Sequence, residues 1–297
     1  VRGALKKIES DRTAAEATST GSMTAFGTDG FSLGDGGSAN DINGVSGTTY
    51  VAWGWAANGA GSSNEDGSIN TTATSANTTA GFSVSTYTGT GANATVGHGL
   101  GIAPSLVIIK SRNDTHDWYV RTPALSGTEF LVLNTTAAKG TASPEVWNST
   151  LPTSSIVNIG TSIGVNRSSY NYVMYCFAEI PGYSSIGSYE GNGSADGPFV
   201  YTGFRPSFLL VKNIDATESW QIRDSKRDPF NVSKEILYPD TSGAEATSGG
   251  GQFGDLLSNG FKWRGADGGN NSAATFIYIA FAENPFGGDG VAPATAR

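Results

Sequence analysis

One segment of aromatic and β-branched residues occurs three times in the chain, and it constrains the fold more than any other feature. The copies read Tyr50-Val51-Ala52-Trp53-Gly54-Trp55-Ala56, Tyr172-Val173-Met174-Tyr175-Cys176-Phe177-Ala178 and Phe276-Ile277-Tyr278-Ile279-Ala280-Phe281-Ala282. Large side chains recur at every second position, and these residue types suit a pleated, buried surface. A turn containing Pro or Gly follows each copy. We therefore expect three central strands, each covered on both faces and each closing one structural unit.

A second feature is a duplication with constant spacing. The offset is 102 residues (206 − 104 = 102) for the pairs Tyr87 and Tyr189, Pro104 and Pro206, Lys110 and Lys212, Trp118 and Trp220, and Arg121 and Arg223. This register runs without a gap from Tyr87 to Arg121, which indicates an internal repeat. Residues 10–16 match the middle of both later copies, at 133–138 and 238–245, so the first copy joins the same pattern.

These repeats divide the chain into five parts. Residues 1–58 match the second half of a β-sandwich unit, 59–80 are a connector rich in Ser, Thr and Asn, 81–183 and 184–286 are complete units, and 287–297 form a C-terminal tail. Half a sandwich cannot bury both of its faces. We therefore expect preceding polypeptide or a partner to complete the first unit.

The second unit has the pattern of short strands separated by turns. Strands are predicted at residues 82–87, 105–111, 118–121, 130–133, 156–159 and 172–178. The chain has 41 Gly among 297 residues and only 15% charged residues, which favours strands and turns over long helices. The predicted fold is all-β, with tandem antiparallel β-sandwiches of the jelly-roll or lectin-like kind.

Charge and cysteine content argue against several classes of partner and site. The net charge of −8 opposes binding to nucleic acid or to an anionic membrane. The sequence contains no apolar run of the roughly 20 residues that a membrane span requires. The single cysteine, Cys176, leaves no intrachain disulfide and no Cys-based zinc site, and we expect it to be a small buried core residue. Neither nucleic-acid binding nor membrane insertion is expected.

Few residues suggest chemistry. His98 lies in a Gly-rich turn without a recognisable nucleophile or carboxylate partner, so we expect it to tie a loop to the sheet. Glu179 and Glu283 end equivalent strands of different units, which favours pairing with Arg or capping of a turn over acid–base catalysis. The loop at residues 64–67 offers oxygen ligands without the spacing of a calcium loop, and bound Ca²⁺ stays an alternative. We predict no catalytic residue, no cofactor and no metal site.

The repeated pair Trp118 and Arg121, with its counterpart Trp220 and Arg223, has two interpretations. A repeated Trp most often belongs to a core. The functional alternative is a surface on which the indole stacks against a glycan, with the Arg beside it.

Several motifs resemble a repeat module of structural proteins of tailed bacteriophages, best represented in marine phages. The matching motifs are Asp29-Gly30-Phe31-Ser32-Leu33-Gly34, Tyr50-Val51-Ala52-Trp53, Ala80-Gly81-Phe82, Tyr87-Thr88-Gly89-Thr90-Gly91, His98-Gly99-Leu100-Gly101-Ile102-Ala103-Pro104, residues 191–206, Lys226-Arg227-Asp228-Pro229-Phe230-Asn231 and Ala282-Glu283-Asn284-Pro285-Phe286. They cover nearly the whole chain, and residues 191–206 are the most specific part. The resemblance implies a tail-fibre or capsid-fibre component with no assigned catalytic residues.

The expected function is therefore that of a non-enzymatic virion protein, located in the extracellular particle, which shapes the particle and attaches it to the host surface. Expected partners are other copies of the chain, other virion proteins and a host-surface glycan. An exposed first unit favours self-association, and analogy with elongated viral fibres suggests a homotrimer. The alternatives are a secreted bacterial adhesin or carbohydrate-binding module, and a glycan depolymerase with carboxylates converging in a groove.

Overall fold

In the computed structural model, which describes residues 1–36, 42–142 and 144–285, the chain consists of antiparallel β-sheets. The first unit contains β1 (Lys6–Lys7), β2 (Ala17–Thr18), β3 (Met23–Phe26) and β4 (Phe31–Leu33). The second unit contains β5 (Ala73–Asn77), β6 (Phe82–Thr88), β7 (Ala94–Gly97), β8 (Leu106–Ser111), β9 (Tyr119–Arg121), β10 (Glu129–Val132), β11 (Gly140–Thr141), β12 (Ile156–Ile159), α1 (Ile163–Asn166) and β13 (Asn171–Phe177). The third contains β14 (Ser184–Glu190), β15 (Phe199–Tyr201), β16 (Pro206–Asn213), β17 (Gln221–Asp224), β18 (Glu235–Ile236), β19 (Ala246–Thr247), β20 (Gly254–Leu257), β21 (Gly260–Trp263) and β22 (Thr275–Ala282). The predicted all-β class is confirmed.

The second and third units share one strand order. The main sheet of the second unit runs β5-β6-β13-β8-β9-β10-β11, and that of the third runs β14-β22-β16-β17. β6 and β14 begin 102 residues apart (184 − 82 = 102), and both lie beside the closing strand of their unit. Trp118 and Trp220 each stand directly before the equivalent strands β9 and β17. The constant sequence spacing therefore reflects two copies of one fold, as predicted.

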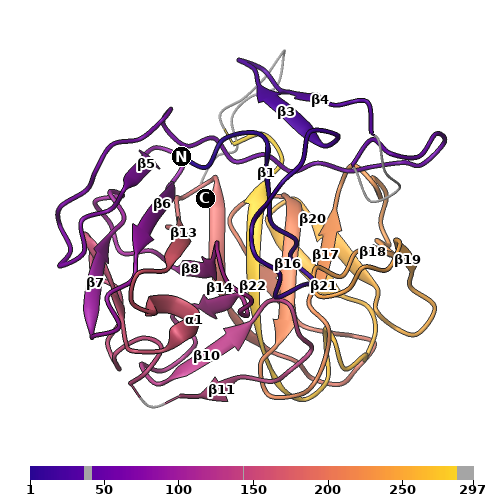
Figure 1. The fold of residues 1–297 in the computed structure, drawn as a ribbon. Helices are drawn as coiled ribbons and strands as arrows, with labels where there is room; N and C mark the ends of the chain where they lie inside the picture. Colours follow the sequence, from indigo (N-terminus) through magenta and orange to yellow (C-terminus); the bar gives the residue numbers. More distant parts are fainter. Residues whose placement is uncertain (37–41, 143, 286–297) are drawn as a thin grey trace.

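Four sheets enclose three hydrophobic cores. The second unit packs its main sheet on the two-stranded sheet β12-β7, and the third unit packs its main sheet on β15-β21-β20. A third, central core lies where the two main sheets face each other. Figure 1 shows the two units side by side, the second in purple to magenta and the third in orange to yellow.

The closing strands β13 and β22 lie between two cores, as their alternating pattern predicts. On β13, Met174 and Cys176 face the inner core of the unit, whereas Phe177 faces the central core. On β22, Tyr278 faces inward and Ile279 faces the central core. Each strand is also hydrogen-bonded along both edges, β13 to β6 and β8, and β22 to β14 and β16. Cys176 is fully buried on β13, which confirms its predicted position in a core.

The three repeated segments converge at the centre of the molecule. Trp55, Phe177 and Phe281, which occupy the same position in the three copies, form a triangle of ring centroids. Its sides measure 5.8 Å (Trp55 to Phe177), 5.3 Å (Trp55 to Phe281) and 5.7 Å (Phe177 to Phe281), with the rings edge to face. Such aromatic pairs stabilise a core by about 0.5–1.5 kcal/mol each beyond their buried area. The first unit therefore contributes one of the three rings, Trp55, to the central core.

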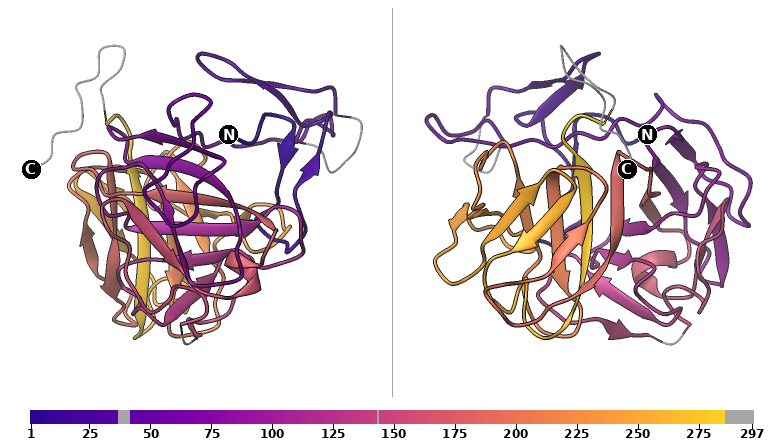
Figure 2. Two further views of the ribbon diagram at one scale, coloured as in Figure 1. Left: turned by 60° about the vertical axis from the view of Figure 1, so that its left-hand side comes forward. Right: turned by 180° about the vertical axis from the view of Figure 1, so that it is seen from behind.

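Two predictions about the first unit and the connector are wrong. Residues 50–57 are extended but form no strand ladder, because among the described residues no strand flanks them as β6 and β8 flank β13. The connector predicted at residues 59–80 contains β5, which pairs with β6 and extends the main sheet of the second unit. The hairpin β3-β4 lies at the periphery of the molecule, above both sandwiches in Figure 1 and apart from them in Figure 2. The predicted tail at 287–297 lies outside the described residues.

Within residues 1–36, 42–142 and 144–285, no helix combines the length and apolar character that crossing a lipid bilayer requires.

Candidate functional site

A buried lysine and a tryptophan of the second unit donate hydrogen bonds to a loop of the first unit. Lys110, on β8, donates from Nζ to the Thr13 carbonyl at 3.1 Å and to the Ser111 carbonyl at 2.8 Å. The Trp118 indole Nε1 donates to the carbonyls of Glu9 (3.0 Å) and Arg12 (3.2 Å) in the same loop. We call this arrangement of lysine, tryptophan and gripped loop the first clasp.

The third unit repeats this arrangement on the second. Lys212, on β16, donates from Nζ to the Thr136 carbonyl at 3.0 Å and to the Glu218 carbonyl at 2.6 Å. Trp220 Nε1 donates to the Val132 carbonyl at 3.0 Å. This second clasp holds residues 132–136, which correspond in sequence to residues 9–13 of the first clasp. Each complete unit therefore grips the preceding unit through the same two side chains.

Burial dominates the electrostatics of both clasps. Lys110 and Lys212 are fully buried, and desolvation lowers the pKa of each amine to about 8. A lysine with a lowered pKa is a candidate nucleophile elsewhere. Here, however, each Nζ is enclosed and its hydrogens are directed at backbone carbonyls. The arrangement is suited to recognising a polypeptide loop rather than to attacking a substrate.

The structure corrects the glycan-binding interpretation of Trp118, Arg121, Trp220 and Arg223, because all four side chains are buried. The tryptophans serve the clasps. Arg121 lies over the Trp147 ring at 5.8 Å and Arg223 over the Trp263 ring at 5.4 Å. Desolvation lowers the pKa of both guanidinium groups to about 10. These residues support the interior of each unit and offer no surface to a sugar.

The two arginines differ in their partners. Arg223 donates to the carbonyls of Ser233 and Gln252. Arg121 has no hydrogen-bond acceptor for any of its guanidinium nitrogens within the described part of the chain. Its contact with Trp147 is therefore a cation–π interaction between buried groups, which is stronger than the same contact in water.

The Tyr-x-Gly-x-Gly motif also has a structural role in both units. Tyr87 stacks on Tyr172 with centroids 5.2 Å apart, and Tyr189 stacks on Phe276 at 5.1 Å. At Gly89, an added Cβ would lie 2.3 Å from the Arg167 carbonyl oxygen, so only glycine fits this close approach of two backbones. The motif therefore closes a turn against the chain before the closing strand.

His98 ties a loop to the second unit and Glu283 pairs with Arg, as predicted, whereas Glu179 contacts Ser185 and no Arg among the described residues. His98 is buried; its Nδ1 accepts from the Leu100 amide (3.2 Å) and its Nε2 lies 3.2 Å from the Thr153 carbonyl, and burial lowers its pKa. Glu283 pairs with Arg205 at 2.7 Å. Burial raises the pKa of Glu179, whose carboxylate accepts from Ser185. Within the described ranges, no cluster of three or more His, Cys, Asp or Glu side chains is placed to hold a metal ion.

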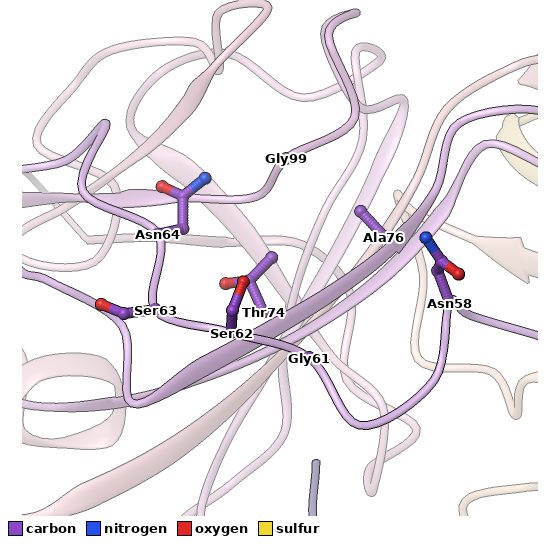
Figure 3. Close-up of a pocket in the computed structure, with 8 residues that line it drawn as sticks. All are labelled: Asn58, Gly61, Ser62, Ser63, Asn64, Thr74, Ala76 and Gly99. Carbon is purple, nitrogen blue, oxygen red and sulfur yellow. The ribbon is translucent and has the colours of Figure 1, made fainter.

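A polar cleft of about 360 Å³ lies between the connector and the second unit (Figure 3). Figure 3 shows Asn64 and Asn58 towards opposite ends, with Ser62 and Thr74 between them. Its groups already bond within the protein: Thr74 Oγ1 pairs with Ser85 Oγ at 2.9 Å, and Asn64 Oδ1 accepts from the Asp66 amide at 3.0 Å. Backbone hydrogen bonds between Ser62 and Thr74 hold the start of the connector against β5, and Asn58, Ser62 and Ser63 are exposed.

The family "Domain of unknown function (DUF7483)" matches residues 1–285. The chain belongs to this family. The match begins in the half unit and runs through both complete units, so the DUF7483 domain comprises all three repeated segments. No curated protein and no solved structure matches the chain.

Two asparagines of this DUF7483 chain have a structural role that sequence reasoning missed. Asn166 Oδ1 accepts from the Thr90 amide (2.8 Å) and Asn271 Oδ1 from the Asn192 amide (2.9 Å), while each Nδ2 donates to two carbonyls. They lie 105 residues apart (271 − 166 = 105), so the 102-residue register does not align them. A second register anchored on the closing strands, where 281 − 177 = 104, brings them within one residue of alignment.

Proposed function

We propose that the chain is a non-enzymatic structural protein of a bacteriophage virion, of the tail-fibre or capsid-fibre type. It acts as a rigid array of β-sandwich units that shapes the particle and contacts the host surface. The repeated clasp carries this proposal: the most distinctive polar side chains of each unit hold the neighbouring unit in place. Tandem domains joined through buried contacts suit a spacer or interaction array. The phage-like motifs supply the virion context.

The proposed partners are other virion proteins, further copies of the chain and a host-surface glycan. The homotrimer stays a prediction. So does the glycan contact, for which the buried Trp and Arg residues are no longer candidates. Any glycan would have to bind elsewhere, and the amide and hydroxyl groups of the cleft in Figure 3 provide suitable hydrogen-bonding chemistry.

Purified particles provide the direct test. Virions from a phage that encodes this chain are banded on a density gradient, and their proteins are identified by mass spectrometry. Antibody against the folded chain should then decorate intact particles at one fixed location in electron micrographs. Absence of the chain from banded particles that contain the major capsid protein would overturn the proposal.

The second candidate is a bacterial adhesin or carbohydrate-binding module, which the polar cleft favours. It predicts retention of the purified chain on immobilised host polysaccharide, and loss of retention in Asn64→Ala. Retention without any association with particles would favour this candidate over the virion protein. Release of oligosaccharides during the same incubation would instead indicate the depolymerase.

A further inference from the structure

Arg121 and Arg223 occupy the same position in the second and third units but have different surroundings. They lie 102 residues apart (223 − 121 = 102), on the equivalent strands β9 and β17. Arg121 lies over the ring of Trp147 at 5.8 Å. Arg223 lies over the ring of Trp263 at 5.4 Å. Both arginines are buried, and Arg121 is only 2% exposed. The two sites are therefore alike in their arginine and tryptophan, and they differ in what accepts the arginine hydrogens.

The path of the chain explains this difference. In the third unit the main sheet ends at β17, and the residues that follow run beside β20, where Ser233 pairs with Gly254. There the Ser233 carbonyl accepts from Nη1 of Arg223 at 3.1 Å. In the second unit the residues that follow β9 form β10, which extends the main sheet. They lie within the sheet, and among the described residues no oxygen accepts from Arg121.

No acidic group offsets the charge of Arg121. Burial alone lowers the pKa of this guanidinium, to about 10, so it is protonated at neutral pH. Burial also lowers the pKa of Arg223, but Tyr238 and Asp228 are near enough to oppose this effect. A buried charge without an acceptor or a counter-charge is strongly unfavourable. The face of the Trp147 ring supplies part of the compensation, and a further partner is required.

A second donor without a partner lies beside Arg121. Trp147 is buried, and its indole Nε1 has no hydrogen-bond acceptor in the described part of the chain. Because Cζ of Arg121 is 5.8 Å from the centroid of that indole ring, one small ion can accept from both groups. Guanidinium and indole are both donors only. The edge of the ring, where Nε1 lies, also carries the positive part of the ring quadrupole.

Two donors with no acceptor favour an anion over water. A water that accepts from both groups still has two hydrogens of its own to donate, and a buried water typically makes about three hydrogen bonds. An anion has no hydrogens to place, and it neutralises the arginine charge. A monatomic anion also needs the least space in an interior packed as densely as an organic crystal.

We propose that the second unit binds a chloride ion between the guanidinium of Arg121 and the indole Nε1 of Trp147. The ion takes the place of the two carbonyls that accept from Arg223 in the third unit. It also joins β9 to the loop that contains Trp147, and so stabilises the second unit. This inference concerns an ion inside one unit and is independent of the proposed function.

Bromide, which replaces chloride and scatters X-rays anomalously, tests the position of the ion. In crystals of the intact chain grown in sodium bromide, we expect an anomalous difference peak in contact with both Arg121 and Trp147. Ordered water without an anomalous signal at this place would overturn the proposal. The matching place beside Arg223 is the internal control and should hold no peak. An equal peak there would also overturn the proposal, because the missing carbonyls would then not be what creates the site.

Thermal unfolding tests whether the ion stabilises the chain. The measurement is made at constant ionic strength, with chloride progressively replacing gluconate. Above the dissociation constant, each tenfold rise in chloride should raise the unfolding midpoint by about 2–4 °C, because the ion binds the folded state.

Two arginine variants assign this chloride response. Arg121→Met should lose it, whereas Arg223→Met should keep it even if the variant is less stable. A full chloride response in Arg121→Met would place the ion elsewhere and contradict the proposal. If Arg121→Met does not fold, the bromide measurement on the unchanged chain decides alone.

Discussion

The first and third copies of the repeated aromatic segment have similar sequences and different structures. β22 (Thr275–Ala282) is a strand with a partner on each edge, whereas residues 50–57 are extended and unpaired. Both contribute an aromatic ring to the same triangle, Phe281 in one case and Trp55 in the other. The comparison teaches that side-chain pattern places a segment against a core, while strand formation requires neighbours that accept its backbone hydrogen bonds.

The largest difference in unfolding free energy is expected between variants of the hairpin β3-β4 of the first unit and the hairpin β20-β21 of the third. Phe261→Ala should cost about 3–5 kcal/mol of unfolding free energy, because it removes a ring from a closed core. Phe31→Ala should change it by less than about 0.5 kcal/mol, since that ring is exposed. Urea unfolding of both variants measures the contrast. Equal losses would mean that the two hairpins have equivalent surroundings in solution.

The aromatic triangle should give the next largest effect. Trp55→Ala removes a half-buried ring that touches Phe177, Phe208 and Phe281, and we expect a loss of about 2–3 kcal/mol. Tyr50→Ala, in the same segment but exposed, is the control and should be nearly neutral. Thermal unfolding monitors both. A neutral Trp55→Ala would show that the first unit does not take part in the central core.

The two clasps should contribute similar free energies of unfolding, but the loss of each should expose a different loop to a protease. Lys212→Met and Lys110→Met each leave a buried carbonyl without its donor, at a cost of about 1–3 kcal/mol. Limited proteolysis should then detect cleavage near residues 132–136 in the first variant and near residues 9–13 in the second. Cleavage at the same site in both would mean that the two clasps do not act separately.

Acid should weaken the attachment of the first unit to the second. Burial raises the pKa of Glu16, but hydrogen bonds from Arg112 (2.9 Å) and Arg2 (2.7 Å) outweigh it, and the net pKa is lowered. A carboxylate with a lowered folded-state pKa stabilises above its unfolded value of 4.5, and this contribution is lost as the pH falls through the folded value. The protection factors of amides in residues 1–20, which compare each exchange rate with the intrinsic rate at the same pH, should therefore fall below about pH 4.5.

Glu16→Gln is the control for this pH effect. It removes the titrating group at nearly constant shape, so the protection factors of residues 1–20 should be low already at neutral pH and should change less with acid. An unchanged acid response in Glu16→Gln would assign the effect to other carboxylates.

The sequence by itself determined the fold class, the 102-residue duplication and the double-sided burial of β13 and β22, because side-chain periodicity and residue type report directly on which faces meet a core. It also suggested structural roles for His98 and Glu283. Only the tertiary structure decided that Trp118 and Trp220 are clasp residues, that β5 joins the second unit, and that residues 50–57 form no ladder. The reason is that the environment of each indole is supplied by a loop 88 to 109 residues away, and that side-chain periodicity does not specify which backbone lies along a strand edge. No local pattern encodes whether such a segment is there to cover them.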